Sequence, residues 1–144
     1  MKRTIVAAMI GMAGMGCVTP SQPGAPDGGA TGIRVEAGKV FDIAVGQEAY
    51  VQGTPIVVRF RGASDDSRCP LDVQCVWAGN AVIQLGLRQG KGAEADARVN
   101  TTLAPKSASV GAYSVRLIGL KPVPRAGKPI AVGDYIATLE VTGG

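Results

Sequence analysis

The stretch Ile-Val-Val-Arg-Phe-Arg at residues 56–61 decides the fold class of this chain. Successive side chains of an extended strand point to opposite faces, so Ile56, Val58 and Phe60 share one face and the two arginines share the other. One face is apolar and the other is charged, which is typical of a β-strand buried on one side only. We therefore expect a half-buried strand here.

The same pattern recurs along the chain, with turn-forming stretches such as Gln-Gly-Lys-Gly at 89–92 between the runs. No run predicts a helix of three turns. Short strands separated by turn signals predict an all-β domain of about seven strands, either an antiparallel β-sandwich, with an immunoglobulin-like one as the leading interpretation, or a small barrel. The strands are expected at 40–45, 48–51, 56–61, 80–88, 98–103, 112–120 and 134–142.

The first residues predict an export signal. Lys2 and Arg3 precede an apolar run at 4–13, which is too short to cross a bilayer because a spanning helix needs about twenty residues. The small residues that lead to Cys17 resemble the lipobox of bacterial lipoproteins, in which the cysteine is acylated and becomes the new N-terminus. We expect residues 1–16 to be a signal peptide of the lipoprotein type.

The resemblance to a lipobox implies a membrane anchor at Cys17. An acylated N-terminus carries enough hydrocarbon for stable anchoring. Val18, and not an aspartate, follows the cysteine, which favours the outer membrane by the enteric sorting rule. Gly14 departs from the lipobox, which usually has Leu, Ile or Val at this place. The alternative is ordinary cleavage nearby, which removes Cys17 or leaves it free.

A Pro/Gly-rich segment follows the cysteine. Residues 18–32 contain three prolines and four glycines and have no apolar period, a composition typical of a flexible tether. We assign residues 17–32 to the tether and residues 33–144 to the β-sandwich domain. The tether holds the domain about 20 Å or more from the membrane surface.

The composition excludes several classes of protein. The chain has no histidine, which removes the usual general base of Ser-His-Asp and Cys-His enzymes and every histidine-ligated metal site. Without residues 1–16 the chain keeps 13 basic and 11 acidic residues, so a nucleic-acid partner is not expected. All four methionines lie in residues 1–15, so a Met/His copper carrier is excluded. We expect no cofactor and no metal.

Two cysteines remain if Cys17 is acylated, and we expect Cys69 and Cys75 to form a disulfide in an oxidising compartment. A redox role is the sharper alternative, since Arg68 could lower the pKa of a neighbouring thiolate. The spacing is not Cys-x-x-Cys, however. A zinc site is less favoured, because two thiolates without histidine leave half of a tetrahedral site to carboxylates.

The other candidates in this loop also have two interpretations. Asp65, Asp66 and Asp72 could supply oxygen ligands to calcium, but their spacing is not that of an EF-hand, and the favoured interpretation is capping, turn hydrogen bonds and pairing with Arg68. Trp77 could be an exposed binding anchor. We expect it instead to be a core residue that packs against the disulfide, because the sandwich has few other large side chains.

The loop also carries a family resemblance. The run Asp-Ser-Arg-Cys-Pro at 66–70, followed by Cys75, Trp77, Ala78 and Gly79, resembles a motif of an uncharacterised family of small bacterial exported proteins and lipoproteins. The resemblance extends over roughly residues 41–142, including 46–60 and the pair Asp134-Tyr135. It implies an exported location and a similar fold, and it implies no activity.

These observations favour a non-enzymatic lipoprotein of the cell envelope, in which a tethered β-sandwich has a structural or partner-binding role. Its partners are the membrane, through the lipid anchor, and an envelope protein. The alternative is an inhibitor or ligand-binding module that acts through the loop from Arg68 to Trp77, because a braced loop loses little entropy on binding. Candidate contacts are Arg68, Leu71, Asp72 and Trp77. An enzyme that uses the loop carboxylates is least favoured, because three acids in one loop do not have distinct environments.

Overall fold

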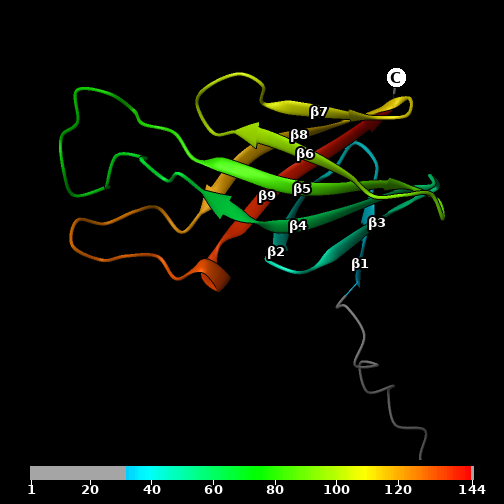
Figure 1. The fold of residues 1–144 in the computed structure, drawn as a ribbon, viewed down its shortest axis with the longest axis horizontal. Coiled ribbons are helices and arrows are strands. Elements are labelled where there is room, and N and C mark those ends of the chain that lie inside the picture. The colour runs from blue at the N-terminus through cyan, green and yellow to red at the C-terminus, as the bar shows by residue number, and fades with distance from the viewer. Residues whose placement is uncertain (1–31, 144) are drawn as a thin grey trace, which may run out of the picture.

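The computed structural model describes residues 32–143, which form two β-sheets packed face to face (Figure 1). The predicted signal peptide at 1–16, the acylation site Cys17 and the tether up to residue 31 lie outside these residues. Within residues 32–143, no helix has the length and apolar character needed to cross a membrane. The one helical turn there is η1 (Val132–Asp134). The prediction of an all-β sandwich is confirmed.

The two sheets are open and do not close into a barrel. The five-stranded sheet has the order β1-β3-β4-β5-β6 and the four-stranded sheet the order β2-β9-β8-β7. Strands β1 and β3 run parallel, and the other pairs are antiparallel. The strands are β1 (Gly32–Glu36), β2 (Val40–Ala44), β3 (Glu48–Gln52), β4 (Ile56–Ser64), β5 (Val82–Gln89), β6 (Ala95–Asn100), β7 (Ser107–Val110), β8 (Tyr113–Lys121) and β9 (Ile136–Gly143).

Nine strands form where about seven were expected. The two additional strands, β1 and β7, each lie at an end of their sheet, and their apolar alternation, Ile33 with Val35 and Ala108 with Val110, extends over only five and four residues. The strand expected at 98–103 forms at Ala95–Asn100, and residues 101–104 bend instead. Strands β3 to β6 follow one another within one sheet, whereas immunoglobulin domains divide consecutive strands between two sheets.

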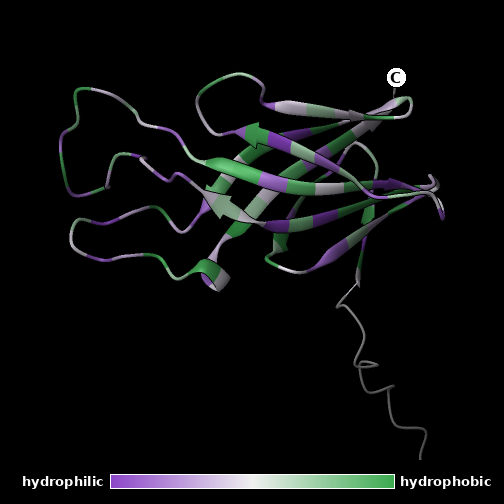
Figure 2. Ribbon diagram, viewed as in Figure 1, coloured by the Kyte–Doolittle hydropathy of each residue, from purple (hydrophilic) through white to green (hydrophobic). Residues whose placement is uncertain are grey.

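The core lies between the sheets and is almost entirely aliphatic. Ile56, Val58 and Phe60 are fully buried, as their alternation predicts, and face apolar residues of the second sheet such as Leu139 and Val141. Figure 2 shows how apolar and polar residues alternate along these strands. Phe60 is the largest fully buried side chain, so the volume between the sheets is filled without any help from the tryptophan.

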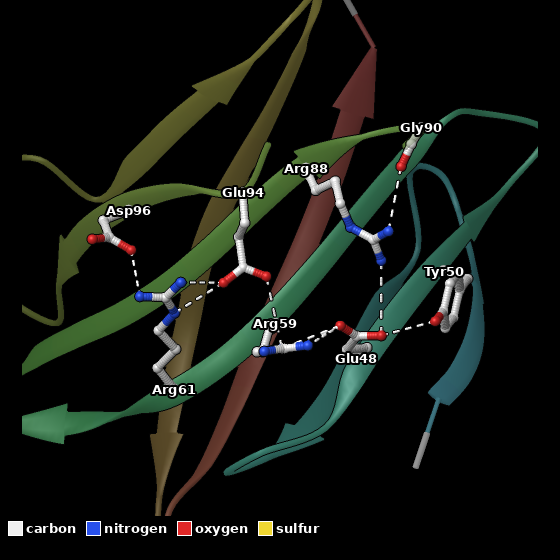
Figure 3. Close-up of polar contacts among 8 residues, drawn as sticks. All are labelled: Glu48, Tyr50, Arg59, Arg61, Arg88, Gly90, Glu94 and Asp96. Atoms are coloured by element: carbon white, nitrogen blue, oxygen red, sulfur yellow. Dashed lines mark hydrogen bonds and ion pairs between the residues drawn. The ribbon is translucent and has the colours of Figure 1, made fainter. Parts of the chain in front are cut away.

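A chain of ion pairs covers the outer face of the five-stranded sheet (Figure 3). Glu48 of β3 accepts hydrogen bonds from Arg59 on β4 and, at 2.8 Å, from the Tyr50 hydroxyl. The Nε atom of Arg59 also lies 3.7 Å from Glu94. The side chain of Glu94 lies over Gly86. A Cβ atom at position 86 would lie 2.9 Å from Cγ of Glu94 and closer still to its carboxylate, so the glycine leaves room for this side chain. The charged faces of β3 and β4 are therefore neutralised within the fold, by pairs that also include Arg61 with Glu94 and Asp96, and Arg88 with Glu48.

This network predicts a loss of stability in acid. Hydrogen bonds from Tyr50 and then Arg59 hold the pKa of Glu48 below its usual 4.5 in the folded state. A carboxyl whose pKa is depressed by folding stabilises the protein above the unfolded pKa, and that contribution is lost as the pH falls through the folded pKa. We expect the free energy of unfolding, measured by urea titration, to begin to decrease below pH 4.5.

Glu48→Gln is the matched variant for this measurement. Its free energy of unfolding at pH 7 is lower than that of the wild type, and it falls less steeply between neutral and acid pH. Parallel pH profiles of the two proteins would contradict the assignment.

Candidate functional site

Three connections gather at one end of the sandwich, which we call the loop end (Figure 1). They are the long β4–β5 connection at 65–81, which we call the braced loop, the β6–β7 connection at 101–106 and the β8–β9 connection at 122–135. In each case one strand ends and the next begins at that end of the sheets. All sequence-predicted contact residues lie on the braced loop.

The disulfide predicted within the braced loop is present. The sulfur atoms of Cys69 and Cys75 are bonded, and their Cα atoms lie 5.9 Å apart. Cross-linking so short a loop contributes about 2 kcal/mol in the chain-entropy model. In this oxidised form neither sulfur is a thiolate, so neither can act as a zinc ligand.

Arg68 points toward the body of the domain and anchors the braced loop. Its guanidinium donates to the carboxylate of Asp66 at 2.8 Å, to the carbonyl of Leu120 at 2.8 Å and to that of Pro122 at 3.1 Å. Only 12% of its side chain is exposed. Sequence analysis grouped Arg68 with the partner contacts, whereas the structure uses its donors within the fold.

Tyr135, the last residue before β9, completes this anchor. Its hydroxyl donates to Asp66 at 2.9 Å. The hydrogen bonds from Arg68, followed by those from the Arg68 backbone and Tyr135, hold the pKa of Asp66 below its usual value. Burial, and then the hydrogen bond to Asp66, raises the pKa of Tyr135. The triad of Asp66, Arg68 and Tyr135 therefore contains a carboxylate held in its charged form and a phenol held in its neutral form.

The two arms of the braced loop are hydrogen-bonded to each other. The N–H of Ser67 donates to the carbonyl of Asn80 at 2.7 Å, and the N–H of Cys69 donates to Ala78 at 3.1 Å. Gly79 lies between these bonds with φ of +69°, and a Cβ atom there would lie 2.5 Å from the carbonyl carbon of Ser67 and closer still to its oxygen. Only glycine fits this approach.

The braced loop is also attached to both neighbouring connections. The side-chain oxygen of Asn80 accepts the N–H groups of Thr102 and Leu103 at 3.0 and 3.2 Å. On the other side, Asp72 accepts the N–H of Ala126 at 2.9 Å. That hydrogen bond lowers the pKa of Asp72. The three connections therefore form one cross-linked unit.

Trp77 is exposed, and the expectation that it is a core residue is wrong. It is 82% exposed and Val76 is 91% exposed. The physical reason is that the hydrogen-bonded arms hold the far part of the braced loop beyond the ends of the sheets, whose core is already filled. Leu71 is 64% exposed, so of the four expected contacts Leu71, Asp72 and Trp77 are accessible. Sequence analysis missed Val76, which stands beside the tryptophan in a stretch without charge.

A shallow hollow of about 320 Å³ lies beside Trp77, and the polar groups around it are largely used internally. Asn80 binds the 101–103 backbone, and the Ser67 hydroxyl bonds to the Asn80 backbone at 3.0 Å. The surface that remains for a ligand is mainly apolar. Its lining consists of Ser67, Trp77, Ala78, Gly79, Asn80, Thr102 and Leu103.

The loop acids do not converge on a common point. Asp66 faces Arg68, Asp72 faces the backbone of Ala126, and the hydroxyl of Ser64 lies 3.4 Å from Asp65. Over residues 32–143 no three potential metal ligands of the His, Cys, Asp or Glu type gather in one place. Hydrogen bonds within turns and pairing with Arg68, rather than calcium binding, therefore account for the contacts of all three acids.

The fold and this end of it define a class: a β-sandwich that carries a rigid, disulfide-braced loop with an apolar exposed tip. Searches with this chain found no matching protein-family model, no match among curated proteins and no match among solved structures. The resemblance to small bacterial exported proteins and lipoproteins stays a prediction.

Proposed function

We propose that this protein is a non-enzymatic lipoprotein of the cell envelope that binds a partner surface through its braced loop. Cys17 carries the lipid anchor, the segment up to residue 31 is the tether, and the sandwich is the rigid support of the loop. The proposed location is the outer membrane or its periplasmic face.

One observation carries the proposal: Val76 and Trp77 are exposed on a loop that is held in place by its disulfide, by Arg68 and by the hydrogen bonds between its arms. Large apolar side chains are costly to expose, and a contiguous apolar patch usually marks an interaction site. The disulfide, the Arg68 anchor and the bonded arms fix the loop before any partner arrives, so binding orders few groups. The export signal and the disulfide are consistent with an envelope location.

Intact-mass spectrometry of the protein recovered from membranes tests the lipid anchor at Cys17 and the disulfide between Cys69 and Cys75 together. We expect a mass that corresponds to a chain beginning at Cys17 with acyl groups attached. We also expect no alkylatable thiol before reduction and two after it, from Cys69 and Cys75.

Cys17→Ser is the control for the anchor, and it should move the protein from the membrane fraction to the soluble fraction. An unacylated mass, or a wild-type protein that fractionates like Cys17→Ser, would contradict the lipid anchor. Two free thiols before reduction would contradict the disulfide between Cys69 and Cys75.

The second candidate function is inhibition of an enzyme by insertion of the braced loop into its cleft. The observation in its favour is the same preorganised backbone, which lowers the entropic cost of binding. Because Arg68 is held within the fold, the inserted residues would be Val76 and Trp77. Inhibition of a purified envelope hydrolase that Trp77→Ala abolishes would favour this candidate, and an unchanged rate at saturating protein would exclude that enzyme as a target.

A further inference from the structure

Two neighbouring stretches at the loop end are rich in apolar residues and carry no charge. Residues 73–80 of the braced loop and residues 101–105 beside it contain no charged side chain. The exposed apolar residues here are Leu71, Val73, Val76, Trp77 and Leu103. We call these five residues the apolar tip. These stretches can leave water without the cost of desolvating a charged side chain. Burying the apolar side chains of the tip is favourable through the hydrophobic effect.

Cations flank the apolar tip on the two shorter connections. Lys106 lies on one of them, and Arg125 and Lys128 lie on the other. Within residues 32–143 these three side chains form no ion pair. The connections at 101–106 and 122–135 contain one acid, Asp134, which lines a hollow with Arg125 and Lys128. Asp72 is the only charged residue between Cys69 and Asn80, and it is turned toward Ala126. Three cations against Asp72 and Asp134 leave a net charge of +1 around the apolar tip.

An apolar tip with a tryptophan, bordered by cations, has the composition of a membrane-interfacial segment. Tryptophan concentrates at the boundary between headgroups and hydrocarbon. Basic residues near a membrane surface each gain about 1 kcal/mol from anionic lipids. A sugar ligand fits less well, because the polar groups of the hollow beside Trp77 are largely spent on the protein's own backbone.

We propose that the apolar tip inserts into the headgroup region of a bilayer that contains anionic phospholipid. The inference rests on the proposed function for the nearness of a membrane. The chain between Cys17 and Gly32 extends over at most about 50 Å, which exceeds the diameter of about 34 Å of a compact sphere with the radius of gyration expected for a domain of this size. The anchored domain therefore reaches the membrane with its loop end, and the anchor and tip together fix its orientation.

Trp77 is the only tryptophan of the chain, so its fluorescence reports on the tip alone. The membrane-extracted protein is reconstituted into vesicles of phosphatidylethanolamine and phosphatidylglycerol, with bromine on the upper acyl carbons as a contact quencher. We expect quenching of Trp77 by the brominated lipid, together with protection from aqueous acrylamide.

Binding to the same vesicles is measured by sedimentation for the Cys17→Ser protein and its variants. Trp77→Ala and Val76→Asp should each weaken binding about tenfold, which corresponds to the loss of about 1.4 kcal/mol. Val40→Asp is the matched control, because Val40 is also exposed (56%) but lies on β2 beside Glu140, away from the loop end. It should bind like the parent protein.

The possible results separate this inference from the proposed function. Quenching of Trp77 in an unacylated protein supports tip insertion even if the lipid anchor fails. An acylated protein whose Trp77 stays accessible to acrylamide and unquenched by brominated lipid overturns tip insertion and leaves the anchor intact. Protection of Trp77 in native envelope membranes, but not in protein-free vesicles, also overturns it and assigns the tip to a protein partner.

Discussion

Gly79→Ala lowers the free energy of unfolding by about 3 kcal/mol or more, the largest single effect that we expect from the loop. The added Cβ atom meets the backbone of Ser67 and lies 2.9 Å from Cα of Arg68. Backbone atoms cannot rotate away, so the arms of the braced loop must separate. The hydrogen bonds from Ser67 to Asn80 and from Cys69 to Ala78 are then lost. Urea titration gives the size of the change, and hydrogen exchange at the Ser67 amide shows where it occurs.

Gly127→Ala is the matched control for this variant. Gly127 has nearly the same backbone angle, with φ of +70°, but nothing lies within 4 Å of its added Cβ atom. This variant therefore reports only the cost of a left-handed conformation for alanine, which is about 1 kcal/mol. Equal losses in the two variants would show that the close approach at Gly79 contributes nothing.

Arg68→Ala removes about 3 kcal/mol from the free energy of unfolding. The side chains of Arg68 and Asp66 are 12% and 13% exposed, and breaking a largely desolvated ion pair is costly because Asp66 keeps only the hydroxyl of Tyr135 and a backbone N–H as donors. The carbonyls of Leu120 and Pro122 lose their donor in the same step. Arg68→Lys keeps the charge but has no planar fork to reach three acceptors, so its loss is intermediate.

The pH dependence distinguishes this role from simple loss of packing. In the wild type the pKa of Asp66 is depressed, mainly by Arg68, so the contribution of the pair is present at neutral pH and lost as the pH falls through the folded pKa. The difference in stability between wild type and Arg68→Ala should shrink in acid. A difference that is the same at pH 7 and in acid would argue against the ion pair.

Arg116→Ala is the control for the removal of an arginine from an ion pair. Arg116 donates to Glu140 at 2.7 Å, but its side chain is 60% exposed. Exposed pairs contribute at most about 1 kcal/mol, so this variant stays close to the wild type. If Arg68→Ala were equally mild, Arg68 would be free to serve as a partner contact after all.

The anchor variants and the tip variants thus divide the braced loop into two parts. Changes at Arg68 or Gly79 reduce stability, whereas changes at Val76 or Trp77 leave stability unchanged and alter binding. The same division explains the motif at residues 66–79 in physical terms. Asp66, Arg68 and Gly79 fix the conformation of the loop, and Trp77 is exposed on it.

Local sequence determined the parts of the structure that depend on local periodicity. The alternation at residues 56–61 predicted which side chains of β4 are buried, and the core confirms it for Ile56, Val58 and Phe60. With Cys17 assigned to the predicted lipid anchor, two cysteines remained, and the predicted pairing of Cys69 with Cys75 is present. Strands β1 and β7 were missed although Ile33 with Val35 and Ala108 with Val110 alternate with polar residues, because runs of five and four residues are too short to stand out.

Only the tertiary structure decided what the loop residues do. The partners of Arg68 and Asp66 in the anchor include Leu120, Pro122 and Tyr135, which lie 52, 54 and 69 residues away along the chain. Nothing in the local sequence places those groups beside the loop. A strand's alternation fixes the face on which a side chain lies, but in a loop the direction of a side chain depends on which distant donors and acceptors the fold brings near. For that reason the arginine is held inside and the tryptophan is left exposed.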